Sequence, residues 1–242
     1  KDGYVDVSMP GYVKDSLKRL LYKQGIYPQY SPHSHTPLRF GRKGTRQYAD
    51  EPDSSPFLSP KDTKHIQSTA GSFLFYGRAI DSTTLPALNE IAHDQAKPTT
   101  KTTDKAQQLM DYLNTYPDAY IQYYASDMVL HVDSDAAYLV NPNARSRIAG
   151  YFHLSDHPNI TKHPKLNGAI LVECKTLRHV VSSSSEAEVA GIFHNAGMAL
   201  PVRHILKALN HPQTPPHLKL TIQQQQDLSM ITFIKNAPNP GI

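Results

Sequence analysis

The spacing of the apolar residues changes near Tyr116, and this change constrains the fold more than any other feature of the sequence. Before it, apolar residues recur every three or four positions, which is the spacing of amphipathic helices. After it, short segments rich in β-branched and aromatic residues follow one another, as strands do. We therefore expect an α/β fold, with a helical part first and a sheet with an antiparallel start second.

Four helical segments are expected before the change in spacing. The first covers residues 11–26, with Val13, Leu17, Leu20 and Leu21 on one face. A stretch rich in Pro, Ser and Gly then runs to about Pro60 and is interpreted as a linker or a long loop. The apolar stripes of the other three helices are Ile66, Ala70, Phe73 and Leu74; Leu85, Leu88, Ile91 and Ala92; and Ala106, Leu109, Met110 and Leu113.

Three strands and a helix are expected after the change. The strands are Ile121–His131, Arg147–Leu154 and Ala169–Val172, and a short apolar run at His217–Leu220 comes last. The helix begins near Ser184, and Pro201 is expected to kink or divide it. Its inward residues are expected to be Val189, Ile192, Phe193 and Ala196.

The composition excludes several classes of protein. Cys174 is the single cysteine, so no internal disulfide and no cysteine-based zinc site is possible, which suits an intracellular, reducing compartment, cytoplasmic or nuclear. No apolar run approaches ~18 residues, so no membrane span is expected. The N-terminal residues do not form a signal peptide. The 13 histidines are interpreted mainly as solvated loop residues.

Positive charge is concentrated at the start of the chain. Residues 1–65 contain 11 Lys and Arg against 7 Asp and Glu, whereas residues 66–242 contain 14 of each. Lys14, Lys18, Arg19 and Lys23 are the candidates for contact with a nucleic-acid backbone. An ordinary solvated helix face would carry the same residues, so both interpretations stay open.

Two acidic residues are placed where they could share a metal ion. Asp135 lies at the end of the first expected strand, and Glu188 lies in the first turns of the helix after the third strand. Carboxylates from a strand and a packed helix can converge on Mg²⁺, as in phosphodiester cleavage by two metal ions. The alternative is that Asp135 forms a turn and Glu188 favours the helix dipole.

Several ordered motifs resemble those of copia-type retrotransposon polyproteins, over roughly residues 4–219. The motifs similar to the ribonuclease H domain are residues 134–139, 144–152 and 180–188. Those similar to the segment after the polymerase palm, and to the thumb and connection, are residues 9–13, 31–33, 71–79 and 123–128.

The resemblance implies a ribonuclease H-like mixed sheet at residues 119–219, after a reverse transcriptase thumb remnant and linker at 1–60 and a helical connection at 61–118. It implies Asp135 and Glu188 as catalytic Mg²⁺ ligands, and Glu188 is preferred to Glu186 because an apolar and then a small residue follow it. The implied partners are an RNA–DNA hybrid or template-primer duplex and the remainder of the polyprotein.

The pattern of the family breaks after Lys219. The next strand of the family ends in Thr-Asp-Asn, whose Asp is the third metal ligand, but here no carboxylate follows until Asp227. Permitted codons, read from the last base of the Lys219 codon, can encode Thr-Asp-Asn, so residues 220–242 are interpreted as an out-of-frame or disordered tail. Tyr4-Val5-Asp6-Val7 lacks the second Asp of a polymerase site.

Two hypotheses follow for the function. The first is a fragment of a reverse transcriptase and ribonuclease H polyprotein, whose parent cleaves the RNA of hybrids with Mg²⁺, and which is itself catalytically inactive. The second is a non-catalytic nucleic-acid-binding module derived from a retroelement.

Overall fold

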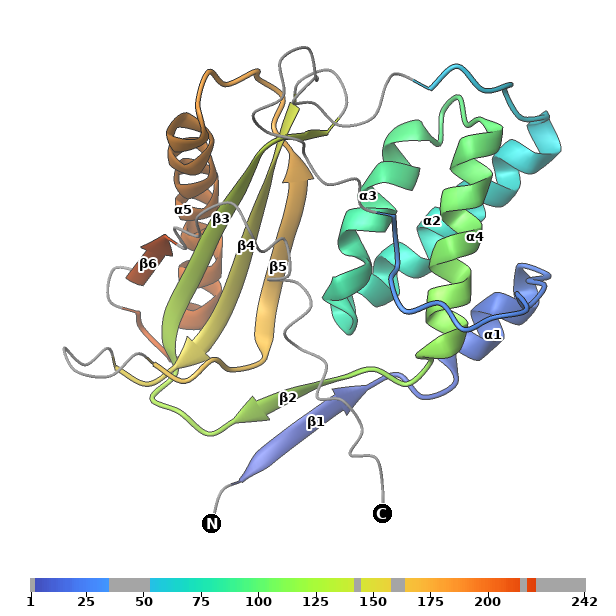
Figure 1. Cartoon of the computed structure of the whole chain (residues 1–242). Coiled ribbons are helices and arrows are strands. Elements are labelled where there is room, and N and C mark those ends of the chain that lie inside the picture. Colours follow the sequence, from blue (N-terminus) through green and yellow to red (C-terminus); the bar gives the residue numbers. More distant parts are fainter. Residues whose placement is uncertain (1–2, 35–52, 142–144, 158–163, 214–216, 221–242) are drawn as a thin grey trace. The chain divides into compact units, whose positions relative to one another are not determined.

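The computed structural model describes residues 3–34, 53–141, 145–157, 164–213 and 217–220, the last of these as backbone. The chain divides into two compact units, which are described separately (Figure 1). The helical unit contains residues 7–34 and 53–121, and the sheet unit contains residues 3–6 and most of the chain after residue 121. A mixed α/β fold is therefore confirmed, and the finer domain boundaries expected from the sequence remain predictions.

Helices make up the helical unit. They are α1 (Tyr12–Arg19), α2 (Pro60–Ala79), the short 3-10 helix η1 (Ser82–Thr84), α3 (Leu85–Asp94) and α4 (Thr100–Thr115). The three apolar stripes expected for α2, α3 and α4 face the interior, where Phe73, Ile91 and Leu113 are fully buried. Only Leu74 and Ala92 of these stripes are partly exposed. The prediction of these helices is confirmed.

Helix α1 is shorter than expected, because it ends at Arg19 and not near residue 26. Leu20 caps it, and Leu21 has a left-handed φ of 53° that an α-helix cannot continue. Val13, Leu17 and Leu20 are buried as expected, whereas Leu21 is 84% exposed. Lys23 therefore lies beyond the helix.

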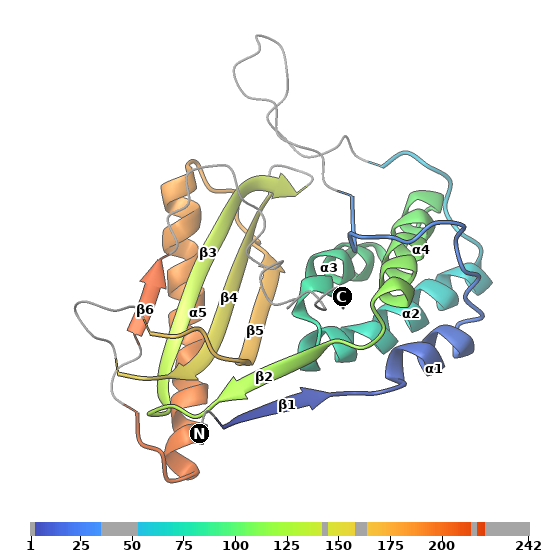
Figure 2. The ribbon, with the colours of Figure 1, turned by 60° about the horizontal axis from the view of Figure 1, so that its bottom comes forward.

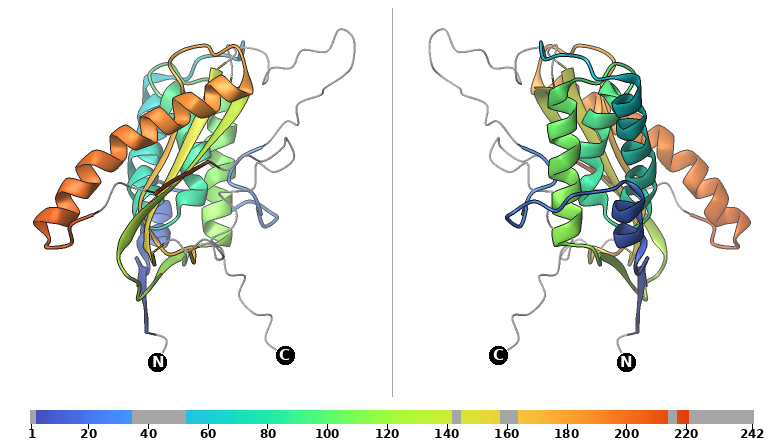
Figure 3. Two further views of the ribbon diagram at one scale, coloured as in Figure 1. Left: turned by 90° about the vertical axis from the view of Figure 1, so that its left-hand side faces the viewer. Right: turned by 90° about the vertical axis from the view of Figure 1, so that its right-hand side faces the viewer.

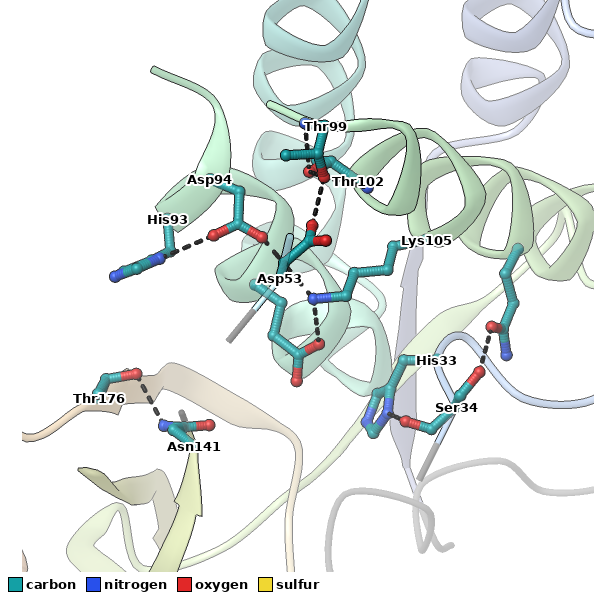
Figure 4. Close-up of polar contacts among 12 residues, drawn as sticks. His33, Ser34, Asp53, His93, Asp94, Thr99, Thr102, Lys105, Asn141 and Thr176 are labelled. Carbon is teal, nitrogen blue, oxygen red and sulfur yellow. Dashed lines mark hydrogen bonds and ion pairs between the residues drawn. The ribbon is translucent and has the colours of Figure 1, made fainter. Parts of the chain in front are cut away.

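Capping side chains fix where the long helices begin. Ser59 accepts a hydrogen bond from the backbone N–H of Asp62 at the start of α2. At the start of α4, Thr99 and Thr102 form a reciprocal capping box, which Figure 4 shows beside Asp53. The Thr99 hydroxyl also donates to Asp53. Hydrogen bonds from Ser55 and Thr99 lower the pKa of Asp53 to about 2.

A four-stranded mixed sheet forms the centre of the sheet unit, in the order β5-β4-β3-β6. Its strands are β3 (Val129–Asn141), β4 (Arg145–Ser155), β5 (Ala169–Thr176) and β6 (His217–Leu220). Strands β3, β4 and β5 pair antiparallel, and β6 pairs parallel to β3. Strands β1 (Tyr4–Ser8) and β2 (Tyr120–Tyr124) form a separate two-stranded sheet.

The first expected strand is wrong in its extent. Residues 121–131 do not form one strand, because β2 ends at Tyr124 and β3 begins at Val129. Met128, between them, has a left-handed φ of 61° that interrupts extended backbone. Since β3 continues to Asn141, Asp135 lies in the middle of a strand and not at its end.

Helix α5 (Ser184–Ala208) lies across one face of the four-stranded sheet (Figures 1 and 2). Pro201 is inside this one helix and does not divide it. The expected inward face is wrong: Val189 and Phe193 are 65% and 82% exposed, and the buried positions are mostly small residues. These buried positions are Ala187, Gly191, Asn195, Ala199 and Leu206.

Two expectations concern parts of the chain that the structure does not describe. The out-of-frame or disordered tail and most of the Pro-rich linker lie outside the described residues. Among the helices that are described, none combines the length and hydrophobicity needed to cross a membrane.

Candidate functional site

Asp135 lies on β3, which pairs with β4 on one side and with β6 on the other. In β3 it pairs with Ala149 of β4, and the neighbouring Ser134 pairs with Leu220, the last residue of β6. The parallel ladder between β3 and β6 therefore ends one residue before Asp135. The backbone N–H of Ala136, just beyond this end, lies near the side chain of Glu188 on α5.

Asn195 holds α5 against the sheet. Its side chain is fully buried, and Nδ2 donates to Oγ of Ser134 at 2.8 Å and to the carbonyl oxygen of Ala149 at 2.9 Å. Gly150 allows this close approach, because a Cβ there would lie 2.4 Å from Oδ1 of Asn195. The same helix passes over β3 at Gly191, where a Cβ would lie 3.5 Å from the carbonyl oxygen of Asp135.

Glu188 lies one turn before Gly191 and so on the same side of α5. The backbone N–H of Ala136, the residue after Asp135, lies near the carboxylate of Glu188 and favours its charged form. Oε2 of Glu188 is buried and has no hydrogen-bond partner among the described residues. The fold thus brings two carboxyl groups from distant parts of the sequence to the same backbone amide.

Ionisation is unfavourable at both carboxyl groups. Burial, and next the negative charge of Asp135, raise the pKa of Glu188 to about 7. Burial also raises the pKa of Asp135, although the N–H of Ala136 partly offsets the effect. Carboxyl groups in this state gain from a bound cation, because positive charge removes the repulsion and satisfies the orphaned oxygen.

Glu186 differs from Glu188 in every respect that matters for a metal. It is exposed, and its carboxylate accepts hydrogen bonds from the backbone N–H and the hydroxyl of Ser182, both at 2.6 Å. These bonds lower its pKa. Ser183 in turn accepts from the N–H of Glu186. Glu186 therefore stabilises the start of α5 and faces away from Asp135.

No third ligand joins the pair within the described part of the chain. No group of three or more His, Cys, Asp or Glu residues is arranged there to hold a metal ion. Asp133, the nearest acidic residue in sequence, lies 3.4 Å from Nε2 of the buried His153. That contact engages Asp133 in the sheet and leaves Asp135 and Glu188 as the site.

The sequence analysis missed Asn195. One feature of the sequence indicates its role. Asn195 lies seven residues after Glu188 and so on the same helical face, and it is polar at a position where an apolar core residue is expected. A polar residue at such a position needs buried partners, and here they are Ser134 and Ala149.

The basic residues expected to contact nucleic acid belong to the helical unit. Lys14, Lys18 and Arg19 are on α1, and Lys23 follows it; all are exposed. Nζ of Lys14 lies 3.9 Å from an exposed carboxylate oxygen of Asp118, a separation at which water screens the attraction strongly.

Comparison of the sequence with protein-family models finds no match, and comparisons with curated proteins and with solved structures find none either.

Proposed function

We propose that this chain is a segment of a copia-type retrotransposon polyprotein, with the end of a reverse transcriptase and part of a ribonuclease H domain. The order of the strands supports the proposal, because β6 is parallel to the central β3 and α5 covers one face of the sheet. Such an arrangement suits the ribonuclease H-like sheet expected from the motifs.

One observation carries the proposal: Glu188 lies close enough to Asp135 that burial, and next the negative charge of Asp135, raise the pKa of Glu188 to about 7. Paired carboxylates with raised pKa values are typical of sites that bind Mg²⁺ or transfer protons. Asp135 and Glu188 would hold the ion. When bound, Mg²⁺ supplies the charge that activates water and stabilises the leaving oxygen in hydrolysis of a hybrid.

The same site is proposed to be inactive in this chain. A strand that extended β6 by one residue in its present register would place that residue beside Asp135. This is position 221, where the present sequence has Thr and permitted codons read in the shifted frame can encode Asp. With two carboxylates, the ion is held too weakly and too loosely for efficient cleavage.

A single substitution tests the metal site. Thr221→Asp should add the missing ligand, so that calorimetry with Mn²⁺ shows binding about ten-fold tighter or more than in the unchanged chain. Adding Asp135→Asn should remove this gain. Gln225→Asp is the control, since it adds the same charge four residues further along. A gain that is equal in the control, or that survives Asp135→Asn, would contradict the proposal.

The inactivity has its own test. The unchanged chain should leave the RNA strand of an RNA–DNA hybrid intact in the presence of Mg²⁺ or Mn²⁺. Cleavage that disappears in Asp135→Asn would show instead that the site is complete. The encoding DNA tests the origin of the tail: it should read through Thr-Asp-Asn in a second frame near codon 219.

A further inference from the structure

Residues 21–34, here called the strap, are fixed along α4 (Figure 3). The hydroxyl of Tyr22 donates to Oδ1 of Asp111 at 2.6 Å, and the N–H of Gln29 donates to Oγ1 of Thr115 at 3.0 Å. Further bonds join the strap to the side chains of Gln107 and Gln108. Since backbone groups and Tyr22 make most of these bonds, the remaining large side chains of the strap are free to face outward.

Four large apolar side chains of the strap are exposed. Leu21 is 84% exposed, Ile26 91%, Tyr27 81% and Tyr30 72%. The ring of Tyr30 is supported from one side by Tyr116, with 6.5 Å between the ring centroids. Large exposed apolar side chains gathered within residues 21–30, on an anchored segment, are typical of a surface that binds a partner.

Positive charge prevails in this part of the chain. Residues 12–30 contain four cations, Lys14, Lys18, Arg19 and Lys23, against one acid, Asp15. All four cations are exposed. The surface is therefore complementary to a polyanion that also offers flat apolar groups.

We propose that the strap and α1 bind single-stranded nucleic acid, with Tyr27 and Tyr30 stacking on bases and the four cations contacting phosphates. In a duplex the base faces are already stacked, so exposed tyrosines can gain little from them, whereas a single strand presents these faces freely. This surface uses no metal and neither carboxylate of the candidate site. The binding proposal therefore goes beyond the proposed function and can be tested independently of it.

Fluorescence anisotropy of the full chain tests the proposal with a labelled 20-nucleotide (dT) strand and a 20-base-pair duplex. The single strand should bind about ten-fold more tightly or better. Tyr27→Ser/Tyr30→Ser should weaken binding to the single strand about ten-fold or more. Affinity falls with salt, and Lys18→Ser/Lys23→Ser should make this negative slope of log affinity against log salt shallower by about 1.4. Phe193→Ser, an equally exposed aromatic residue of the sheet unit, is the control and should bind normally.

A conservative pair of variants separates stacking from loss of folding. Tyr27→Phe/Tyr30→Phe keeps both rings and should keep the affinity for the single strand. Equal affinity for duplex and single strand, unchanged binding in Tyr27→Ser/Tyr30→Ser, or no binding to either oligonucleotide would overturn the proposal. So would binding of poly-glutamate or anionic vesicles as tight as that of the (dT) strand.

Discussion

Glu188→Gln is expected to stabilise the protein at neutral and alkaline pH. In the folded state the pKa of this carboxyl is about 7, against 4.5 for an unperturbed glutamate, because of burial and the charge of Asp135. Glutamine keeps an acceptor for the N–H of Ala136 but carries no charge. The substitution therefore removes the unfavourable ionisation and retains the hydrogen bond.

The size of the effect follows from the pKa. Below pH 4.5 the carboxyl is protonated in both the folded and the unfolded chain, so its charge has no effect on stability. Between pH 4.5 and 7 the unfolded chain releases the proton first, and the free energy of unfolding falls. The full difference is about 3 kcal/mol, at about 1.4 kcal/mol per pH unit. Since Glu188 is only partly buried, we expect a gain of about 1 to 3 kcal/mol at pH 8.

Urea unfolding, followed by the NMR signals of β3 and β4, measures this gain within the sheet unit. Glu188→Gln should be clearly more stable than the unchanged chain at pH 8, and the difference should be small at pH 5. Glu186→Gln is the matched control two residues away. Its carboxylate caps α5 and has a lowered pKa, so its loss should destabilise the protein at pH 8.

Two results would contradict this prediction. One is equal stability of Glu188→Gln and the unchanged chain at pH 8. The other is a gain in the free energy of unfolding that persists undiminished at pH 5. Either result would mean that Glu188 ionises normally and does not share its environment with Asp135.

Substitutions within each unit test its internal packing. Gly150→Ala should cost about 1 to 3 kcal/mol, because its Cβ would meet Asn195, and in a double-mutant cycle Asn195→Ala should remove part of that cost. Independent effects that simply add would contradict the close approach. Leu109→Ala should cost about 2 to 5 kcal/mol in denaturant, since Leu109 is fully buried. Leu21→Ala should change stability little, and a similar loss for both would show that the strap is packed inward.

The local sequence determined the helices of the helical unit. In α2, α3 and α4 large apolar residues such as Phe73, Ile91 and Leu113 repeat at the helical spacing, and burying them leaves one choice of inward face. The composition also limited the chemistry, because with Cys174 as the only cysteine the candidate ligands are oxygen and nitrogen atoms. Asp135 and Glu188 were indicated by their places in the expected strand and helix and by the resemblance of the motifs around them.

The tertiary structure decided which face of α5 is buried. Hydrophobicity alone would bury Phe193, yet the helix approaches the sheet through small residues such as Gly191 and Ala199 and through Asn195. A short distance between helix and strand gives close, favourable packing, whereas large side chains would hold the two apart. Leu21 and Met128 have left-handed φ values, and they likewise interrupt a helix and a strand that the apolar pattern would have continued.

The properties of the site also depend on the fold. Asp135 and Glu188 are far apart in the sequence, and nothing local predicts that Glu188 lies near Asp135 and the N–H of Ala136. Burial raises both pKa values, and the nearby charge of Asp135 raises that of Glu188 further. The sequence alone therefore named the acidic residues, and the packing of α5 against β3 makes them a pair.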